Sequence, residues 1–140
     1  MLLAALMFTA LLAVGIAHAL WSFGRSWPIR DPALLAPAVI GVPGVTRVPR
    51  LASFGVAVLV LAAGVFALAL ADHTSGGWSL NGIGLLLAAV FLGRGVAGYT
   101  QWWQAKTPLE PFRTLDRRNY SPLCLGLGIG FLVLVVLRLI

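Results

Sequence analysis

The sequence predicts an all-α integral membrane bundle of four transmembrane helices with a proline-rich first loop, forming a single domain over residues 1–140. Hydrophobic residues make up 60% of the chain and charged residues only 10%, whereas a soluble domain carries about 25% charged residues. The mean hydropathy is +0.97. Four apolar stretches approach the roughly 20 residues that cross a hydrocarbon core as a helix: about 2–23, 51–71, 80–103 and 122–140. No alternating pattern of a β-barrel is present, and helices satisfy their own backbone groups in lipid.

The first apolar stretch has two interpretations. It ends in Ala17-His18-Ala19, which fits the small-residue pattern of a secretory cleavage site. It lacks the positively charged region that normally opens a signal peptide. We therefore expect a retained transmembrane helix.

The loop over residues 24–50 contains five prolines and the apolar stretch 33–42. Asp31 followed by Pro32 is typical of an N-cap and a first helical position. We expect a short helix or apolar turn here, lying along the membrane surface or over the bundle.

The third and fourth apolar stretches are rich in glycine, and small residues let membrane helices approach closely. A turn is expected around 71–82 with Gly76 and Gly77. Ser121 is expected to cap the fourth helix, with Pro122 in its first turn. Gly126 and Gly130 form a G-x-x-x-G pair, which favours tight packing against the third helix, with homodimer contact as the alternative.

The distribution of charge predicts the orientation of the chain. The net charge is +6, but the basic residues gather between helices one and two and between helices three and four, which is the positive-inside pattern. We expect a multi-pass protein of the bacterial inner (cytoplasmic) membrane, with loops 24–50 and 104–120 cytoplasmic and both termini outside. Membrane lipids, a membrane-protein partner or a second copy are then the expected partners, and nucleic acid is not.

Two polar residues stand out within the apolar stretches. Arginine at a helix centre costs about 2.5–3.5 kcal/mol on insertion scales, so an intramembrane arginine usually has a partner or a role. Arg94 either pairs with Asp116 as a structural charge or holds an anionic group of a substrate or lipid. His18 is a packing residue or, less expectedly, an axial ligand of haem or a pigment. The sequence indicates no cofactor, and a zinc site would lack further ligands beyond Cys124.

The predicted topology brings the remaining polar and aromatic groups to the cytoplasmic end. This cluster forms either a polar latch that fixes the helices or the wall of a pocket. The candidate ligand-binding residues are His18, Trp21, Arg94, Tyr99, Gln101, Asp116, Arg117, Tyr120 and Cys124.

Three motifs carry a resemblance to a known family. They are H-A-L-W with G-R-S-W-P (residues 18–28), F-L-G-R-G-V-A-G-Y (91–99) and L-D-R-R-N-Y-S-P-L-C-L (115–125). With these motifs the chain resembles a bacterial family of small four-helix membrane proteins of unknown function. The resemblance implies the fold and no activity. It marks seven residues for testing: His18, Trp21, Arg94, Tyr99, Asp116, Tyr120 and Cys124.

Three functional hypotheses follow. The leading hypothesis is a non-catalytic bundle or accessory subunit that binds a small amphiphile or partner at its cytoplasmic end. The second is a membrane enzyme acting on a lipid-like or quinone-like substrate, with catalytic candidates His18, Arg94, Asp116 and Tyr120. The enzyme hypothesis requires His18 and Arg94 to face one cavity. The third is a small oligomeric transporter or a pigment- or haem-binding subunit.

Overall fold

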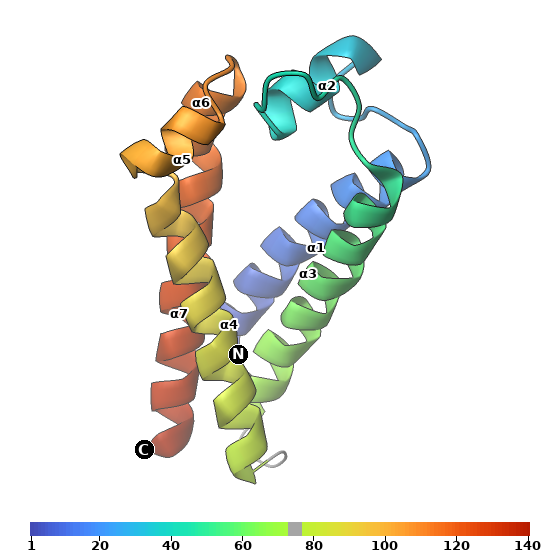
Figure 1. The fold of residues 1–140 in the computed structure, drawn as a ribbon. Coiled ribbons are helices and arrows are strands. Elements are labelled where there is room, and N and C mark those ends of the chain that lie inside the picture. Colours follow the sequence, from blue (N-terminus) through green and yellow to red (C-terminus); the bar gives the residue numbers. More distant parts are fainter. Residues whose placement is uncertain (73–76) are drawn as a thin grey trace.

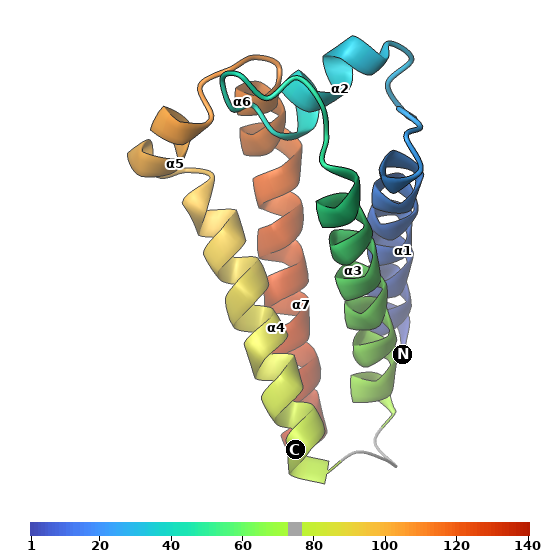
Figure 2. The same ribbon diagram turned by 45° about the vertical axis from the view of Figure 1, so that its right-hand side comes forward.

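The chain folds as two antiparallel helical hairpins (Figure 1). The computed structural model describes residues 1–72 and 77–140, and no strand occurs among them. In the first hairpin α1 (Leu2–Ser22) packs on α3 (Arg50–Ala71), and in the second α4 (Gly77–Ala97) packs on α7 (Ser121–Leu139). Both termini lie at one end, and the short helices α2, α5 and α6 lie at the other (Figure 2). Gly76 of the expected turn lies outside the described residues.

Within the part of the chain that the structure describes, four helices are long and apolar enough to cross a membrane: Leu2–Ser22, Arg50–Ala71, Gly77–Ala97 and Phe112–Leu139. Each is 21 to 28 residues long, and about 20 residues are needed for a hydrocarbon core. The all-α class with four membrane-spanning helices is therefore confirmed.

The third long helix ends earlier than the sequence suggested. We expected helix over 80–103, but α4 begins at Gly77 and ends at Ala97, and α5 (Gln101–Lys106) is a separate helix. Thr100 starts α5 as its N-cap, with an extended backbone and a side-chain oxygen that accepts from the Trp103 backbone N–H at 3.3 Å. An N-cap hydroxyl that replaces an intrahelical bond is a strong start signal, and here it overrides the continuous apolar pattern.

The fourth long helix begins before Ser121, so the expected cap is wrong. Helix α6 (Phe112–Leu115) runs through a wide π-turn, η1 (Asp116–Tyr120), directly into α7. Ser121 has helical backbone angles and makes no cap hydrogen bond to the backbone. Pro122 follows this turn at once; a proline cannot donate to the carbonyl four residues back, and its ring crowds that carbonyl. The wider turn relieves this conflict without breaking the helix.

The proline-rich loop contains the short helix that Asp31-Pro32 predicts. Helix α2 spans Pro32–Val39, and Asp31 Oδ1 accepts from the Ala33 backbone N–H at 2.9 Å. Although α2 lies between α1 and α3 in sequence, it is fastened to the second hairpin. The hydroxyl of Tyr120 donates to the Ala38 carbonyl at 3.1 Å, and the Leu109 N–H donates to the Gly41 carbonyl at 3.3 Å.

Glycines set the spacing within each hairpin. A Cβ on Gly15 of α1 would lie 2.7 Å from the Leu61 side chain of α3. A Cβ on Gly128 of α7 would lie 2.6 Å from the Leu92 side chain of α4. The G-x-x-x-G pair expected at 126 and 130 is not used as a unit, because Gly126 faces open space and Gly130 lies against Met7 of α1.

Among the described residues, the long helices of the two hairpins pack on each other toward the end that carries the termini. The shared core there includes Met7, Leu11, Leu70 and Phe131, and Leu70 of α3 lies against Gly84 of α4. Leu59 is eleven residues from Leu70 and so occupies the same face of α3. Leu70 is 0% exposed and Leu59 is 70% exposed. The face that joins the hairpins at one end is thus uncovered toward the other, where Figure 1 shows the ribbons diverging.

Gly128 and Gly126 provide a matched test of the α4–α7 contact. We expect Gly128→Ala to lower the free energy of unfolding by about 1–3 kcal/mol, because the new methyl would also lie 2.9 Å from the Leu92 backbone nitrogen. Gly126→Ala, two residues away with nothing within 4 Å, should change it little. Equilibrium unfolding in mixed micelles measures both, and equal effects would contradict this packing.

Candidate functional site

A buried carboxylate lies at the basic end of the second hairpin. Asp116 in η1 is 2% exposed, and both of its oxygens are hydrogen-bonded. Oδ1 accepts from Arg94 Nη2 at 2.7 Å and from Ser121 Oγ at 3.1 Å. Oδ2 accepts from Trp103 Nε1 at 2.9 Å. We call these residues, Arg94, Trp103, Asp116 and Ser121, the Asp116 network.

The π-turn brings Asp116 and Ser121 together. The two residues are five positions apart, which places them on different faces of an α-helix. A π-turn aligns groups separated by five residues instead. The irregular turn therefore lets one helix supply both an anion and a hydroxyl to the same point.

Arg94 reaches the network from α4. Its Nη1 lies 3.5 Å from Ser121 Oγ, and its guanidinium carbon lies 4.7 Å from the centre of the Trp103 ring. Its side chain is 30% exposed. The Asp116 charge and the Trp103 ring together compensate the charge that makes arginine costly in a membrane helix. The expected pairing of Arg94 with Asp116 is thus what the structure contains.

Gly98 makes room for this network. A Cβ there would overlap the Ser121 hydroxyl and would lie 2.9 Å from Asp116 Oδ2. The position is one turn beyond Arg94, so any side chain larger than hydrogen would push α4 away from η1. The contact between α4 and the buried carboxylate therefore depends on this glycine.

Three of the other predicted residues surround the network without joining it. The Tyr99 hydroxyl donates to the backbone carbonyl of Arg117 at 3.1 Å. The side chains of Gln101 and Arg117 are exposed. These groups lie at the rim of the network and leave its centre to Asp116.

Tyr120 and Cys124 follow one face of α7. Tyr120 fastens α2 through its hydroxyl, and its ring lies 5.9 Å from the Phe112 ring, centre to centre. Cys124, one turn further, is half-buried. Buried Phe131 lies seven residues beyond Cys124, so Tyr120, Cys124 and Phe131 share the face of α7 that points toward the interior.

His18 and Trp21 belong to the first hairpin. Their rings contact edge to face at 4.6 Å, and Trp21 Nε1 donates to the Trp27 carbonyl at 2.7 Å. Within residues 1–72 and 77–140, no hydrogen bond or ring contact joins either residue to Arg94 or Asp116. The sequence thus grouped residues of both hairpins, and the structure joins only those of the second.

His18 nevertheless faces the second hairpin. It lies seven residues beyond Leu11 and eleven beyond Met7, the α1 residues that pack in the shared core, so the three share one face. Its Nδ1 is buried and has no hydrogen-bond partner among the described residues. Buried polar atoms normally have partners, so this atom marks a position where a polar group would be accommodated.

The sequence did not identify Trp103 or Ser121 as parts of the site. The candidate residues do not include Trp103, and Ser121 is expected only as a helix cap. No spacing in the sequence signals either role, because Trp103 enters through the break after α4 and Ser121 through the π-turn.

Chemically, the arrangement is a buried polar latch. Both oxygens of Asp116 accept hydrogen bonds from the chain, and the residue is buried. The described residues contain no group of three His, Cys, Asp or Glu side chains that could hold a metal ion. The latch ties α4, α5 and α7 together at one point.

The comparisons with known proteins concern the whole bundle. The model of a family described as "Protein of unknown function (DUF3995)" matches residues 11–131. That range contains every residue of the Asp116 network. No curated protein and no solved structure matches the chain.

A double-mutant cycle on Arg94 and Asp116 tests the latch. We expect Asp116→Leu alone to lower the free energy of unfolding by about 2 kcal/mol, because it leaves the arginine unpaired. Arg94→Met alone should also destabilise, since it strands a buried carboxylate. The double variant should lose less than the sum of the single variants, by at least 1 kcal/mol. Additive losses in the same unfolding assay would show that the pair does not act as a latch.

Proposed function

The chain belongs to the DUF3995 family of unknown function, and we propose that it is a non-catalytic membrane bundle that binds a small amphiphile between its hairpins. The binding surface would be the part of the interhairpin faces that the shared core leaves uncovered. One observation carries the proposal: the α3 face that is 0% exposed at Leu70 is 70% exposed at Leu59. An apolar occupant of the membrane would cover that face.

The interhairpin faces combine apolar surface with few polar groups, as ligand sites do. Leu59 and Val56 supply apolar surface from α3. In the described part of the chain, the buried Nδ1 of His18 on α1 has no hydrogen-bond partner, and the side chain of Arg94 on α4 is 30% exposed. An amphiphile with an apolar tail and a small polar head matches this composition.

The charge distribution supports the orientation that we propose. The end of the bundle that carries α2, α5 and η1 holds every basic residue except Arg138 and every acidic residue except Asp72. Basic residues are in excess at this end. Under the positive-inside rule this end lies in the cytoplasm and the termini lie outside. We propose the bacterial inner membrane as the location.

The burial of Asp116 supports binding over catalysis. A general acid or base needs a position within hydrogen-bond reach of the reacting group, and this carboxylate is buried among donors of the chain itself. His18 and Arg94 come from hairpins that diverge at this end. Within residues 1–72 and 77–140, no hydrogen bond or ring contact joins the two residues, which supports a binding role.

Filling the uncovered face should displace the amphiphile. We expect Leu59→Trp to lower the amount of amphiphile that copurifies with the full chain in mild detergent several-fold, because the larger ring occupies apolar surface that the tail would cover. Mass spectrometry of organic extracts measures the retained molecules per chain.

Val65→Trp is the matched control for Leu59→Trp. Val65 lies on the same helix and is 60% exposed, but it is on a different face, so retention should stay at the parent level. The parent chain should retain a defined amphiphile at about one per chain or per oligomer. Absence of any retained amphiphile, or an equal loss in both variants, would contradict the proposed function.

A further inference from the structure

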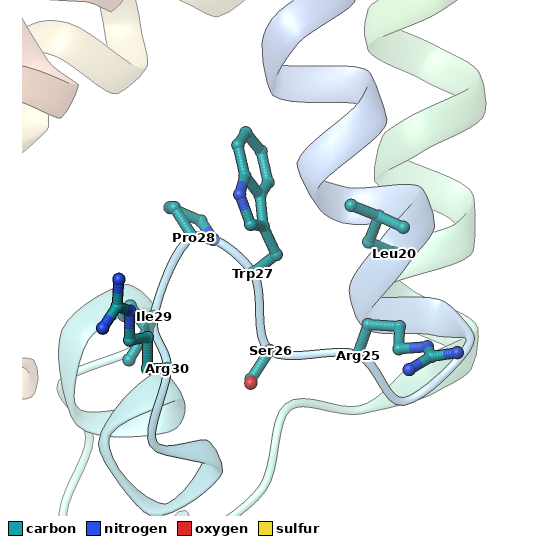
Figure 3. Close-up of a pocket in the computed structure, with 7 residues that line it drawn as sticks. All are labelled: Leu20, Arg25, Ser26, Trp27, Pro28, Ile29 and Arg30. Atoms are coloured by element: carbon teal, nitrogen blue, oxygen red, sulfur yellow. The ribbon is translucent and has the colours of Figure 1, made fainter.

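The loop between α1 and α2 forms a pocket of its own. Its volume is about 350 Å³, within the range of small-molecule pockets. Figure 3 shows the residues that line it: Leu20, Arg25, Ser26, Trp27, Pro28, Ile29 and Arg30. None of them belongs to the Asp116 network.

Hydrogen bonds hold this loop in shape. The Arg25 N–H donates to the Leu20 carbonyl at 2.9 Å, and the Ile29 N–H donates to the Ser26 carbonyl at 2.9 Å. Trp21 Nε1 fixes the Trp27 carbonyl from α1. The pocket is therefore a formed feature of the loop.

The pocket combines an apolar centre with cations on two sides. In Figure 3 the Trp27 ring points back along α1 toward the level of Leu20, while Arg25 and Arg30 extend to opposite sides of the loop. The Trp27 side chain is 59% exposed. In the described part of the chain, neither arginine forms an ion pair. An occupant must therefore offer apolar surface to the ring and negative charge to the guanidinium groups.

The position of the pocket adds a second requirement. It begins just beyond Ser22, the last residue of the first membrane-spanning helix, and so lies at the depth of lipid headgroups. Tryptophan concentrates at that depth, and a planar guanidinium binds phosphate in a bidentate manner. A molecule with phosphate at headgroup depth and an apolar part below it meets both requirements.

We propose that this pocket binds an anionic phospholipid, with its phosphate at Arg25 or Arg30 and its apolar part against Trp27 and Leu20. The site uses different residues from the interhairpin surface, because its lining does not include His18, Leu59 or Arg94. The lipid site therefore stands whether or not an amphiphile binds between the hairpins.

The test uses the full chain in nanodiscs with lipids that carry brominated acyl chains, which quench nearby tryptophan. The quenching of Trp27 is obtained as the tryptophan quenching of the parent chain minus that of Trp27→Phe. We expect brominated phosphatidylglycerol to be preferred over brominated phosphatidylcholine around Trp27 by about fivefold or more, as one or two juxtamembrane arginines would give.

Two double variants that remove the same charge distinguish a specific lipid site from general electrostatic attraction by the basic end of the protein. Arg25→Gln with Arg30→Gln should bring the preference close to one. Arg47→Gln with Arg118→Gln removes two exposed basic residues of the same end outside the pocket, and should retain most of the preference. Survival of the preference in the first variant, or an equal loss in the second, would overturn the proposal.

Inorganic phosphate distinguishes a lipid from a free anion. Replacing chloride by phosphate at constant ionic strength should leave the preference for phosphatidylglycerol in place, because the lipid is also held through its apolar part. Loss of the preference would assign the pocket to free phosphate and overturn the lipid proposal.

Discussion

The close approach of helices at glycine is the constraint on which this structure depends. In lipid, burying leucine or valine contributes little to the association of helices. Van der Waals contact between closely packed backbones must drive the association instead. Gly15 provides that contact in the first hairpin, and Gly95 and Gly128 provide it in the second. Between the hairpins, Gly84 and Gly130 provide it only toward the end with the termini. The chain is consequently two tight pairs whose long helices pack together at one end, while α2 and Gly41 after it bridge them at the other.

The Asp116 network follows from that architecture. Where the hairpins diverge, α1 and α3 no longer pack on α4 and α7, and a buried ion pair with further hydrogen bonds holds α4 and α5 against α7. A buried ion pair is weak evidence for stability in general, since desolvation offsets much of the attraction. Its better-supported role is to select one arrangement of elements. Here we expect it to fix the register of α4 on α7 and the position of α5, which its hydrogen bonds join.

Sequence patterns predicted the elements better than their ends. Hydropathy located all four spans, and Asp31-Pro32 located α2, because both signals are local. The end of α4 was not predictable from the same pattern, since apolar residues continue through Trp102 and Trp103 while Thr100 and Gly98 interrupt the helix. The expected membership of a family of unknown function is confirmed by the match over residues 11–131.

The candidate site was predictable only in part. An arginine in an apolar stretch usually has a counter-ion, and the sequence places Asp116 at the same basic end as Arg94. The pairing of these two residues was therefore predictable. Ser121 and Trp103 depend on a π-turn and on a helix break, which are tertiary outcomes. The sequence placed His18 and Trp21 at the same end as the network. Their neighbours depend on how the hairpins diverge, which the pattern of a single helix does not predict.

Distances between spin labels in nanodiscs test the central claim, that the hairpins meet at one end and separate at the other. With Cys124 replaced by alanine, one label pair sits at Phe54 and Val96 and the other at Val65 and Leu85, all four exposed. Within each helix the two positions are eleven residues apart and so share a face. We expect the Phe54–Val96 distance to exceed the Val65–Leu85 distance by more than the width of either distribution. Equal distances would mean that the hairpins run side by side along their whole length, and would contradict the account.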